Sequence, residues 1–256
     1  MNIKIIFFDI DGTLVGFDEG DISEKVKESL RNLNNKGIKL FLATGRAPYM
    51  IPEFEGVEFD GAICFNGGYC FERDNIIYSQ PLEKDDIKII VDNARKMGIA
   101  SAVASTNSHV TNDFDVNLEE YFGISGNSSN VTDSFDSFLQ KDIYQMMVGT
   151  VSAQDKRLME GTSHCRIARW WDRAVDVIHI TSGKDKAIEI ILNYYGIARE
   201  ESMAFGDGGN DLDMIRYAGV GIAMGNAVDD VKYHADYVTD TCENDGIVSA
   251  LEHFGL

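Results

Sequence analysis

The stretch IIFFDIDGTLV, residues 5–15, carries the feature that decides the fold. Residues Ile3 to Ile10 are mostly apolar, which is typical of a buried strand. Two acids, Asp9 within this run and Asp11 just after it, lie near its end, and the run breaks at Gly12. Two carboxylates at the end of a buried strand need a partner, because isolated charges are unfavourable in a protein interior. The stretch therefore predicts a strand that delivers acidic groups to a site.

Strand-like and helix-like segments alternate at both ends of the chain. Ser23 can cap a helix that stops at Gly37, and residues 38–43 form a second apolar strand. Residues 184–195 have the pattern of an amphipathic helix, and SMAFGDG, residues 202–208, reads as a strand that enters a glycine turn. Such alternation predicts an α/β core: a Rossmann-like, doubly wound, mostly parallel sheet with helices on both faces.

The middle of the chain has a different pattern. A helix-like segment opens it, and short β-like runs follow, separated by a stretch rich in Ser, Asn, Asp and Gly at residues 124–137. This is an α+β pattern inside an α/β one. We therefore predict a core formed by residues 1–81 and 183–256, with an inserted α+β cap domain at residues 82–182.

Composition restricts the partners. The chain has 23 Lys and Arg against 42 Asp and Glu, a formal charge of −19, which disfavours binding to nucleic acid or to an anionic membrane. The first apolar run is too short to span a bilayer, and it lacks a signal-peptide cleavage pattern. The four cysteines are scattered, as in a protein of the reducing cytoplasm, where we expect this one.

Polar residues occur where the predicted strands of the core end. In an open parallel sheet, ligands bind at the carboxyl ends of the strands. If these strands share one sheet, one edge gathers carboxylates, a hydroxyl and an ammonium group. The residues concerned are Asp9, Asp11, Thr44, Gly45, Arg46, Lys184, Asp207, Asn210 and Asp211.

Such a cluster predicts phosphoryl chemistry. Several carboxylates together repel one another unless a cation lies among them, and oxygen ligands without His or Cys suit Mg²⁺. Mg²⁺ attracts phosphate, Thr44 can donate a hydrogen bond to it, and Lys184 can neutralise it. The glycine turns at Gly12 and Gly45 can present backbone N–H groups to the same anion.

Two acids at the end of one strand can take different roles in a phosphoryl-transfer reaction. One carboxylate can act as the nucleophile and form an aspartyl phosphate. The other can protonate the leaving alkoxide and later activate water. Asp9 and Asp11 can supply both roles.

Four segments taken in order resemble a known family. DIDGT at residues 9–13, ATGR at residues 43–46, the segment around Lys184 and GDGGND at residues 206–211 are similar to the four motifs of the haloacid dehalogenase superfamily. Within it, the chain resembles the Cof-type phosphatases, which carry a large cap between the second and third motifs. This resemblance implies Asp9 as nucleophile and Asp11 as general acid and base.

The resemblance also implies a metal and a phosphate site. Mg²⁺ would be held by the side chain of Asp9, the backbone carbonyl of Asp11, and Asp207, with Asp211 as a further ligand or as support for the others. Thr44, Lys184 and Asn210 would bind the phosphoryl group. Because the family commonly has glycine after the motif lysine and this chain has Asp185, Lys186 stays open as the alternative to Lys184.

The expected substrates are small phosphomonoesters, either sugar phosphates or phosphorylated cofactors. Arg46, Asn66 and Trp170 are the candidates for contacts to the substrate or from the cap. A phosphomutase and a non-catalytic sugar-phosphate-binding protein are the alternatives, and a signalling receiver domain would be about half this length. The sequence carries no signal for an oligomeric state.

Overall fold

The structure is a computed structural model that describes residues 2–16 and 21–256. Its internal contacts divide the chain into two compact units. The first unit contains residues 1–44, 52–78 and 183–256, and the second contains residues 45–51 and 79–182. The assignment of these units as a catalytic core and a cap, with the boundaries given above, stays a prediction.

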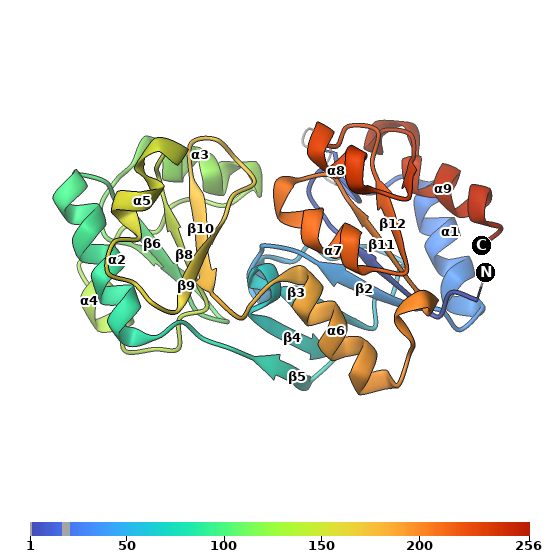
Figure 1. Cartoon of the computed structure of the whole chain (residues 1–256), viewed down its shortest axis with the longest axis horizontal. Helices are drawn as coiled ribbons and strands as arrows, with labels where there is room; N and C mark the ends of the chain where they lie inside the picture. Colours follow the sequence, from blue (N-terminus) through green and yellow to red (C-terminus); the bar gives the residue numbers. More distant parts are fainter. Residues whose placement is uncertain (1, 17–20) are drawn as a thin grey trace. The chain divides into compact units, whose positions relative to one another are not determined.

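The first unit is built on an eight-stranded sheet with the order β13-β12-β11-β1-β2-β3-β4-β5 (Figure 1). Its strands are β1 (Ile5–Phe8), β2 (Lys39–Ala43), β3 (Gly61–Cys64), β4 (Tyr69–Glu72), β5 (Asn75–Ser79), β11 (Ser202–Gly206), β12 (Val220–Ala223) and β13 (Tyr237–Val238). The pairs from β13 to β3 are all parallel, and β4 runs antiparallel to β3. The mostly parallel, doubly wound core is therefore confirmed.

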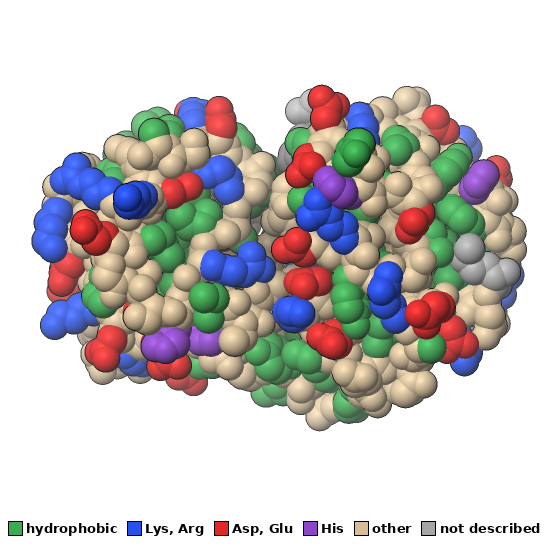
Figure 2. All heavy atoms as spheres, in the orientation of Figure 1, with side chains coloured by type: hydrophobic (Ala, Val, Ile, Leu, Met, Phe, Trp, Pro, Cys, Tyr) green, Lys and Arg blue, Asp and Glu red, His purple; other side chains and the backbone are tan. Residues whose placement is uncertain are grey.

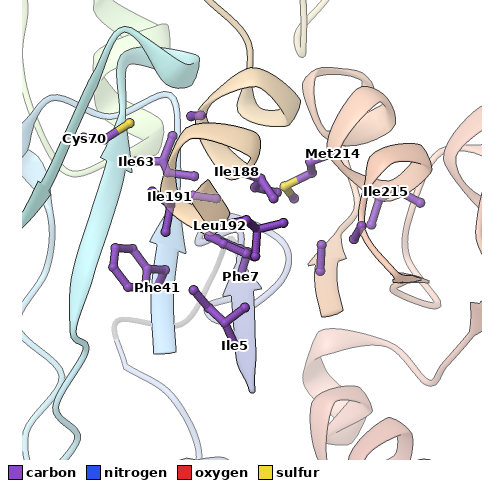
Figure 3. Packing of buried hydrophobic residues seen from close by; sticks show 14 of the residues in the cluster. Ile5, Phe7, Phe41, Ile63, Cys70, Ile188, Ile191, Leu192, Met214 and Ile215 are labelled. Carbon is purple, nitrogen blue, oxygen red and sulfur yellow. The ribbon is translucent and has the colours of Figure 1, made fainter. Parts of the chain in front are cut away.

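Helices cover both faces of this sheet. They are α1 (Glu24–Asn35), α6 (Lys184–Tyr195), α7 (Leu212–Tyr217), α8 (Asp229–His234) and α9 (Gly246–Phe254). Buried residues of α6, α7 and α8 pack on Ile5 and Phe7 of β1 and on Phe41 of β2, and Figure 3 shows much of this cluster. Ile6 and Phe8 are equally buried and point to the opposite face. There α1 packs against β2 and lies beside α9 (Figure 1).

Capping residues explain where α1 and α6 begin and end. The side chain of Ser23 accepts a hydrogen bond from the backbone N–H of Val26, so α1 starts where the sequence predicts. Gly196 ends α6 in the left-handed conformation that glycine adopts without strain. The first residue of α6 is Lys184, which places its side chain at the carboxyl edge of the sheet.

The second unit is an antiparallel sheet with helices. The strand order is β7-β6-β8-β10-β9, formed by β6 (Ser101–Ala104), β7 (His109–Thr111), β8 (Gln145–Val148), β9 (Cys165–Ala168) and β10 (Val175–His179). The helices are α2 (Lys84–Met97), α3 (Val116–Ile124), α4 (Phe135–Phe138) and α5 (Asp155–Leu158). Ile87, Ile90 and Val91 of α2 join Val103 and Met146 in its own buried core.

The surface is mixed in character. Acidic and basic side chains are interspersed over the face shown in Figure 2, with hydrophobic side chains between them. Within residues 2–16 and 21–256, every helix is too short or too polar to cross a bilayer.

Candidate active site

The loop after β1 brings Asp9 to the edge of the sheet while keeping it buried. The backbone N–H of Asp9 still donates to the carbonyl of Phe205 in β11, at 3.0 Å, so this residue is held by the sheet. Beyond it the chain turns sharply, because the N–H groups of Thr13, Leu14 and Val15 all donate to the carbonyl of Ile10. Asp9 is only 6% exposed, and Asp11 is half-buried in the turn.

Gly12 lets this turn approach the end of β11. Its φ is +85°, and a Cβ placed on it would lie 2.2 Å from Oδ2 of Asp207. Asp207 follows β11 directly, and one of its carboxylate oxygens accepts a hydrogen bond from the Thr13 hydroxyl at 3.2 Å. The two motifs, 194 residues apart, are therefore in direct contact.

Asp211 fixes the glycine turn after β11. Its Oδ2 accepts the backbone N–H groups of Asp207, at 3.0 Å, and of Gly208, at 2.9 Å. Its Oδ1 accepts a hydrogen bond from the ammonium of Lys184 at 2.5 Å. Asp211 is 1% exposed, so its carboxylate is shielded from water.

Lys184 lies among the acids. Its ammonium also donates to Oδ1 of Asp9 at 2.7 Å, and its side chain has no exposed surface. The side chain of Lys186 is 57% exposed and lies 3.9 Å from both Asp185 and Glu189. The structure therefore brings Lys184 to the acid cluster and leaves Lys186 in solvent.

Asp9, Asp207 and Asp211 form a group with the composition of a metal site. One carboxylate oxygen from each lies within 4.8 Å of the others, and all three residues are buried. In the part of the chain that the structure describes, no second group of His, Cys, Asp or Glu meets this criterion. Hard oxygen ligands in a buried cluster suit Mg²⁺.

The electrostatics of the cluster favour the binding of a cation. Burial raises the pKa of Asp9 well above its usual range, and the charge of Asp211 raises it further, against a lowering by Lys184. Burial and Asp211 likewise raise the pKa of Asp207 to about 7. Burial would lower the pKa of Lys184, but Asp211 and Asp9 outweigh burial and raise it. One ammonium therefore does not compensate the acids, whereas a divalent cation would.

Thr44 and Asn210 lie close to one buried amide, that of Asn66. Thr44 follows β2 and is 1% exposed, and its carbonyl accepts the backbone N–H of Asn66 at 3.1 Å. The amide nitrogen of Asn210 donates to Oδ1 of Asn66 at 3.0 Å. Asn66 is 2% exposed, so it is buried among the other predicted residues.

Three predicted residues, Gly45, Arg46 and Trp170, belong to the second unit. The carbonyl of Gly45 accepts a hydrogen bond from Gln145, and Arg46 donates to the carbonyl of Met50. The ring of Trp170 packs on Tyr121, with centroids 5.3 Å apart. Their proposed contacts with substrate stay predictions.

Asn226 was missed by the sequence analysis. Its amide nitrogen donates to the carbonyl of Gly12 at 2.8 Å and lies 3.5 Å from Oδ2 of Asp207. Its own oxygen accepts the N–H of Cys242. Asn226 comes three residues after β12, so the rule that ligands bind at the carboxyl ends of parallel strands would have found it.

Comparison with known proteins finds relatives along nearly the whole chain. A sequence model of the haloacid dehalogenase-like hydrolase family matches residues 6–251. The Bacillus subtilis protein YkrA is 31% identical over 100% of this chain and 99% of its own length. The 5-amino-6-(5-phospho-D-ribitylamino)uracil phosphatase YitU of Bacillus subtilis is also 31% identical, over 98% of each chain.

A solved structure extends the likeness to the fold. The sugar phosphatase BT4131, of subclass IIB of the superfamily, superposes with a TM-score of 0.90 at 34% identity, over 98% of this chain and 99% of that one. The family match covers both units, and the relatives align along their whole length. The chain therefore belongs to the haloacid dehalogenase-like hydrolase family and is a phosphatase of its Cof type.

Proposed function

We propose that the protein is a Mg²⁺-dependent phosphatase that hydrolyses small phosphomonoesters through an aspartyl phosphate on Asp9. The observation that carries this proposal is the buried cluster of Asp9, Asp207 and Asp211 around the ammonium of Lys184. Three buried acids with one ammonium attract a further cation, and the cation and the ammonium together attract a phosphate. Asp9, Asp207, Asp211 and the backbone carbonyl of Asp11 would hold Mg²⁺, which when bound neutralises charge on the phosphoryl oxygens.

In the first half of the reaction, a carboxylate oxygen of Asp9 attacks phosphorus and the bond between phosphorus and the ester oxygen breaks. Lys184 orients this carboxylate through its hydrogen bond to Oδ1. Asp11 gives its proton to the leaving alkoxide, which departs as the alcohol. Thr44 and Asn210 bind the phosphoryl oxygens in this proposal.

In the second half, Asp11 is a carboxylate and takes a proton from water. The resulting hydroxide attacks phosphorus, the bond to Asp9 breaks, and inorganic phosphate leaves. Asp11 is half-buried, whereas Asp9 is buried. The proton that Asp11 takes from water is the one that it gives to the next leaving alkoxide.

The substrates proposed are sugar phosphates or phosphorylated cofactors. BT4131 is named a sugar phosphatase, and YitU is named for a substrate with a phosphorylated ribityl chain. Both names describe a phosphate ester on a polyhydroxylated carbon chain. A panel of such esters, ranked by kcat/KM, would identify the preferred class.

Asp9→Asn tests the mechanism because it keeps the size of the side chain and removes the nucleophile. We expect no turnover of p-nitrophenyl phosphate by this variant and an unchanged fold by circular dichroism. The matched control is Asp213→Asn, which changes an exposed acid of α7 and should leave the rate unchanged. Hydrolysis by Asp9→Asn at the wild-type rate, or full activity of the wild type in excess EDTA, would refute the proposal.

A further inference from the structure

The turn between β3 and β4 has an unfavourable backbone. Phe65, Asn66 and Gly67 have φ values of +52°, +51° and +100° in succession. Asparagine and glycine tolerate this left-handed region, but phenylalanine does not favour it. Such a conformation persists only where its surroundings impose it, and it is often found at functional sites. Phe65 is completely buried, which anchors the turn in place.

The backbone of this turn contacts two segments of the proposed phosphate site. The N–H of Asn66 donates to the carbonyl of Thr44 at 3.1 Å. A Cβ on Gly67 would lie 2.2 Å from the carbonyl oxygen of Gly183 and 2.8 Å from its nitrogen, so glycine alone permits this close approach. The turn therefore lies against the residue that precedes Lys184.

The side chain of the turn contacts a third segment. Oδ1 of Asn66 accepts a hydrogen bond from the amide nitrogen of Asn210 at 3.0 Å. In this bond Asn210 donates and Asn66 accepts, so the amide oxygen of Asn210 is turned away from Oδ1 of Asn66. Because the bond restrains the amide plane of Asn210, the second N–H of this amide points in one defined direction.

We propose that Asn66 is a positioning residue that orients Asn210, and with it Thr44, for the phosphoryl group. This inference rests on the proposed function, and it assigns Asn66 a role other than the predicted contact with substrate, which stays a prediction. Oδ1 of Asn66 accepts from Asn210 and its backbone N–H donates to Thr44, so both groups act on neighbours that belong to the proposed phosphate site. Asparagine suits this position since it combines an acceptor with a tolerated left-handed backbone.

A double-mutant cycle tests the proposal. Asn66→Gly deletes the acceptor but still permits the backbone conformation, and Asn210→Ala deletes the donor. If Asn66 acts through Asn210, each single variant should lower kcat/KM by about ten-fold or more, and the double variant should be no worse than the worse single variant. Asn34→Ala is the control, because it removes a half-buried asparagine of α1 that donates to the carbonyl of Glu58.

A conservative variant separates positioning from a merely structural role. Asn66→Asp keeps both the acceptor oxygen and a residue that tolerates the left-handed region. In this background Asn210→Ala should still cost its wild-type factor, whereas in the Asn66→Gly background it should cost clearly less than that factor. A loss of fold alone would lower the unfolding midpoint without producing this pattern.

The cycle is repeated on the binding of inorganic phosphate with Mg²⁺, measured by calorimetry. We expect the same coupling between Asn66 and Asn210 in the dissociation constant of phosphate. This measurement therefore tests the positioning role even if the protein does not hydrolyse phosphate esters. Failure of the proposed function would show as a wild type without phosphatase activity. Effects of the two substitutions that multiply independently, in kcat/KM and in phosphate binding, would overturn the inference.

Discussion

Gly12→Ala is the sharpest test of the site, because one added carbon would meet the carboxylate of Asp207. The new Cβ would lie 2.2, 2.7 and 2.9 Å from Oδ2, Cγ and Oδ1 of that side chain, where contacts of 3.4–4 Å are ordinary. The carboxylate must therefore move by about 1 Å, away from its hydrogen bond with Thr13. A displacement of this size in a catalytic group typically costs about 10²-fold in rate.

The substitution also strains the backbone, so its control must carry the same strain. Gly37 ends α1 with a φ of +76°, close to the +85° of Gly12, but nothing lies within 4 Å of its added Cβ. Both alanine variants should lose roughly 1–2 kcal/mol of unfolding free energy from the left-handed backbone alone. Only Gly12→Ala should lose activity.

The assay is kcat/KM for p-nitrophenyl phosphate with Mg²⁺, together with urea unfolding. We expect a loss of about 100-fold for Gly12→Ala and a change of less than about two-fold for Gly37→Ala. The rise in melting temperature on adding Mg²⁺ should also disappear in Gly12→Ala. Wild-type kcat/KM in a folded Gly12→Ala protein would refute the view that close approach of the two motifs builds the site.

Three further predictions concern other parts of the site. With EDTA present, Lys184→Met should lower the unfolding free energy by about 3–5 kcal/mol, because two buried carboxylates lose the ammonium that pairs with them. A urea unfolding midpoint equal to that of the wild type would contradict this prediction. Gly67→Ala should push Gly183 away and reduce kcat, and Gly37→Ala again serves as the control. Equal values of kcat for the two variants would contradict this prediction. Asp11→Asn should release p-nitrophenolate in a burst and accumulate phosphoprotein, detectable by mass spectrometry, because this leaving group needs no proton but hydrolysis needs the base. Steady turnover without accumulation of phosphoprotein would exclude Asp11 as the general base.

Much of the core could be predicted because its signals are local. The apolar runs that became β1 and β2 are buried strands, apart from the half-buried Lys39 that begins β2. The capping serine of α1 and the glycine that ends α6 are visible in the sequence. The order of the elements then places the motif residues at one edge of the sheet by a general rule. Asp9 and Asp207 could be placed together on this basis alone.

Elements that depend on their neighbours were harder to predict. β5, Asn75–Ser79, was not expected, because it is a short edge strand whose residues are exposed or half-buried and so lack the pattern of a buried strand. The helix α3 was also missed, since its sequence mixes aromatic, acidic and glycine residues. Its cap was present, however: Asp115 accepts the N–H groups of Asn117 and Leu118.

The choice between Lys184 and Lys186 shows why part of the site required coordinates. Both lie at the start of one helix, two residues apart, so the sequence offers each as a phosphate-binding cation. Side chains two positions apart point in different directions from a helix. Only the packing of α6 on the sheet decides that Lys184 is enclosed by Asp9 and Asp211 while Lys186 remains in solvent.

Three glycines shape a second part of the site, and secondary-structure propensities do not predict this role. Gly12 and Gly67 have left-handed backbones, but Gly206 is an ordinary strand residue without a positive φ. Its need for glycine is purely spatial, because a Cβ there would lie 2.6 Å from that of Asp211. At Gly12 and Gly67 the missing side chain lets two distant segments touch, and at Gly206 it lets the following turn fold back so that Asp211 lies against the end of β11. In each case at least one segment holds or adjoins a proposed catalytic group. We therefore expect substitutions at these glycines to lower activity more than stability, since a small backbone shift that preserves the sheet still separates the charged groups that would share one cation in the proposed mechanism.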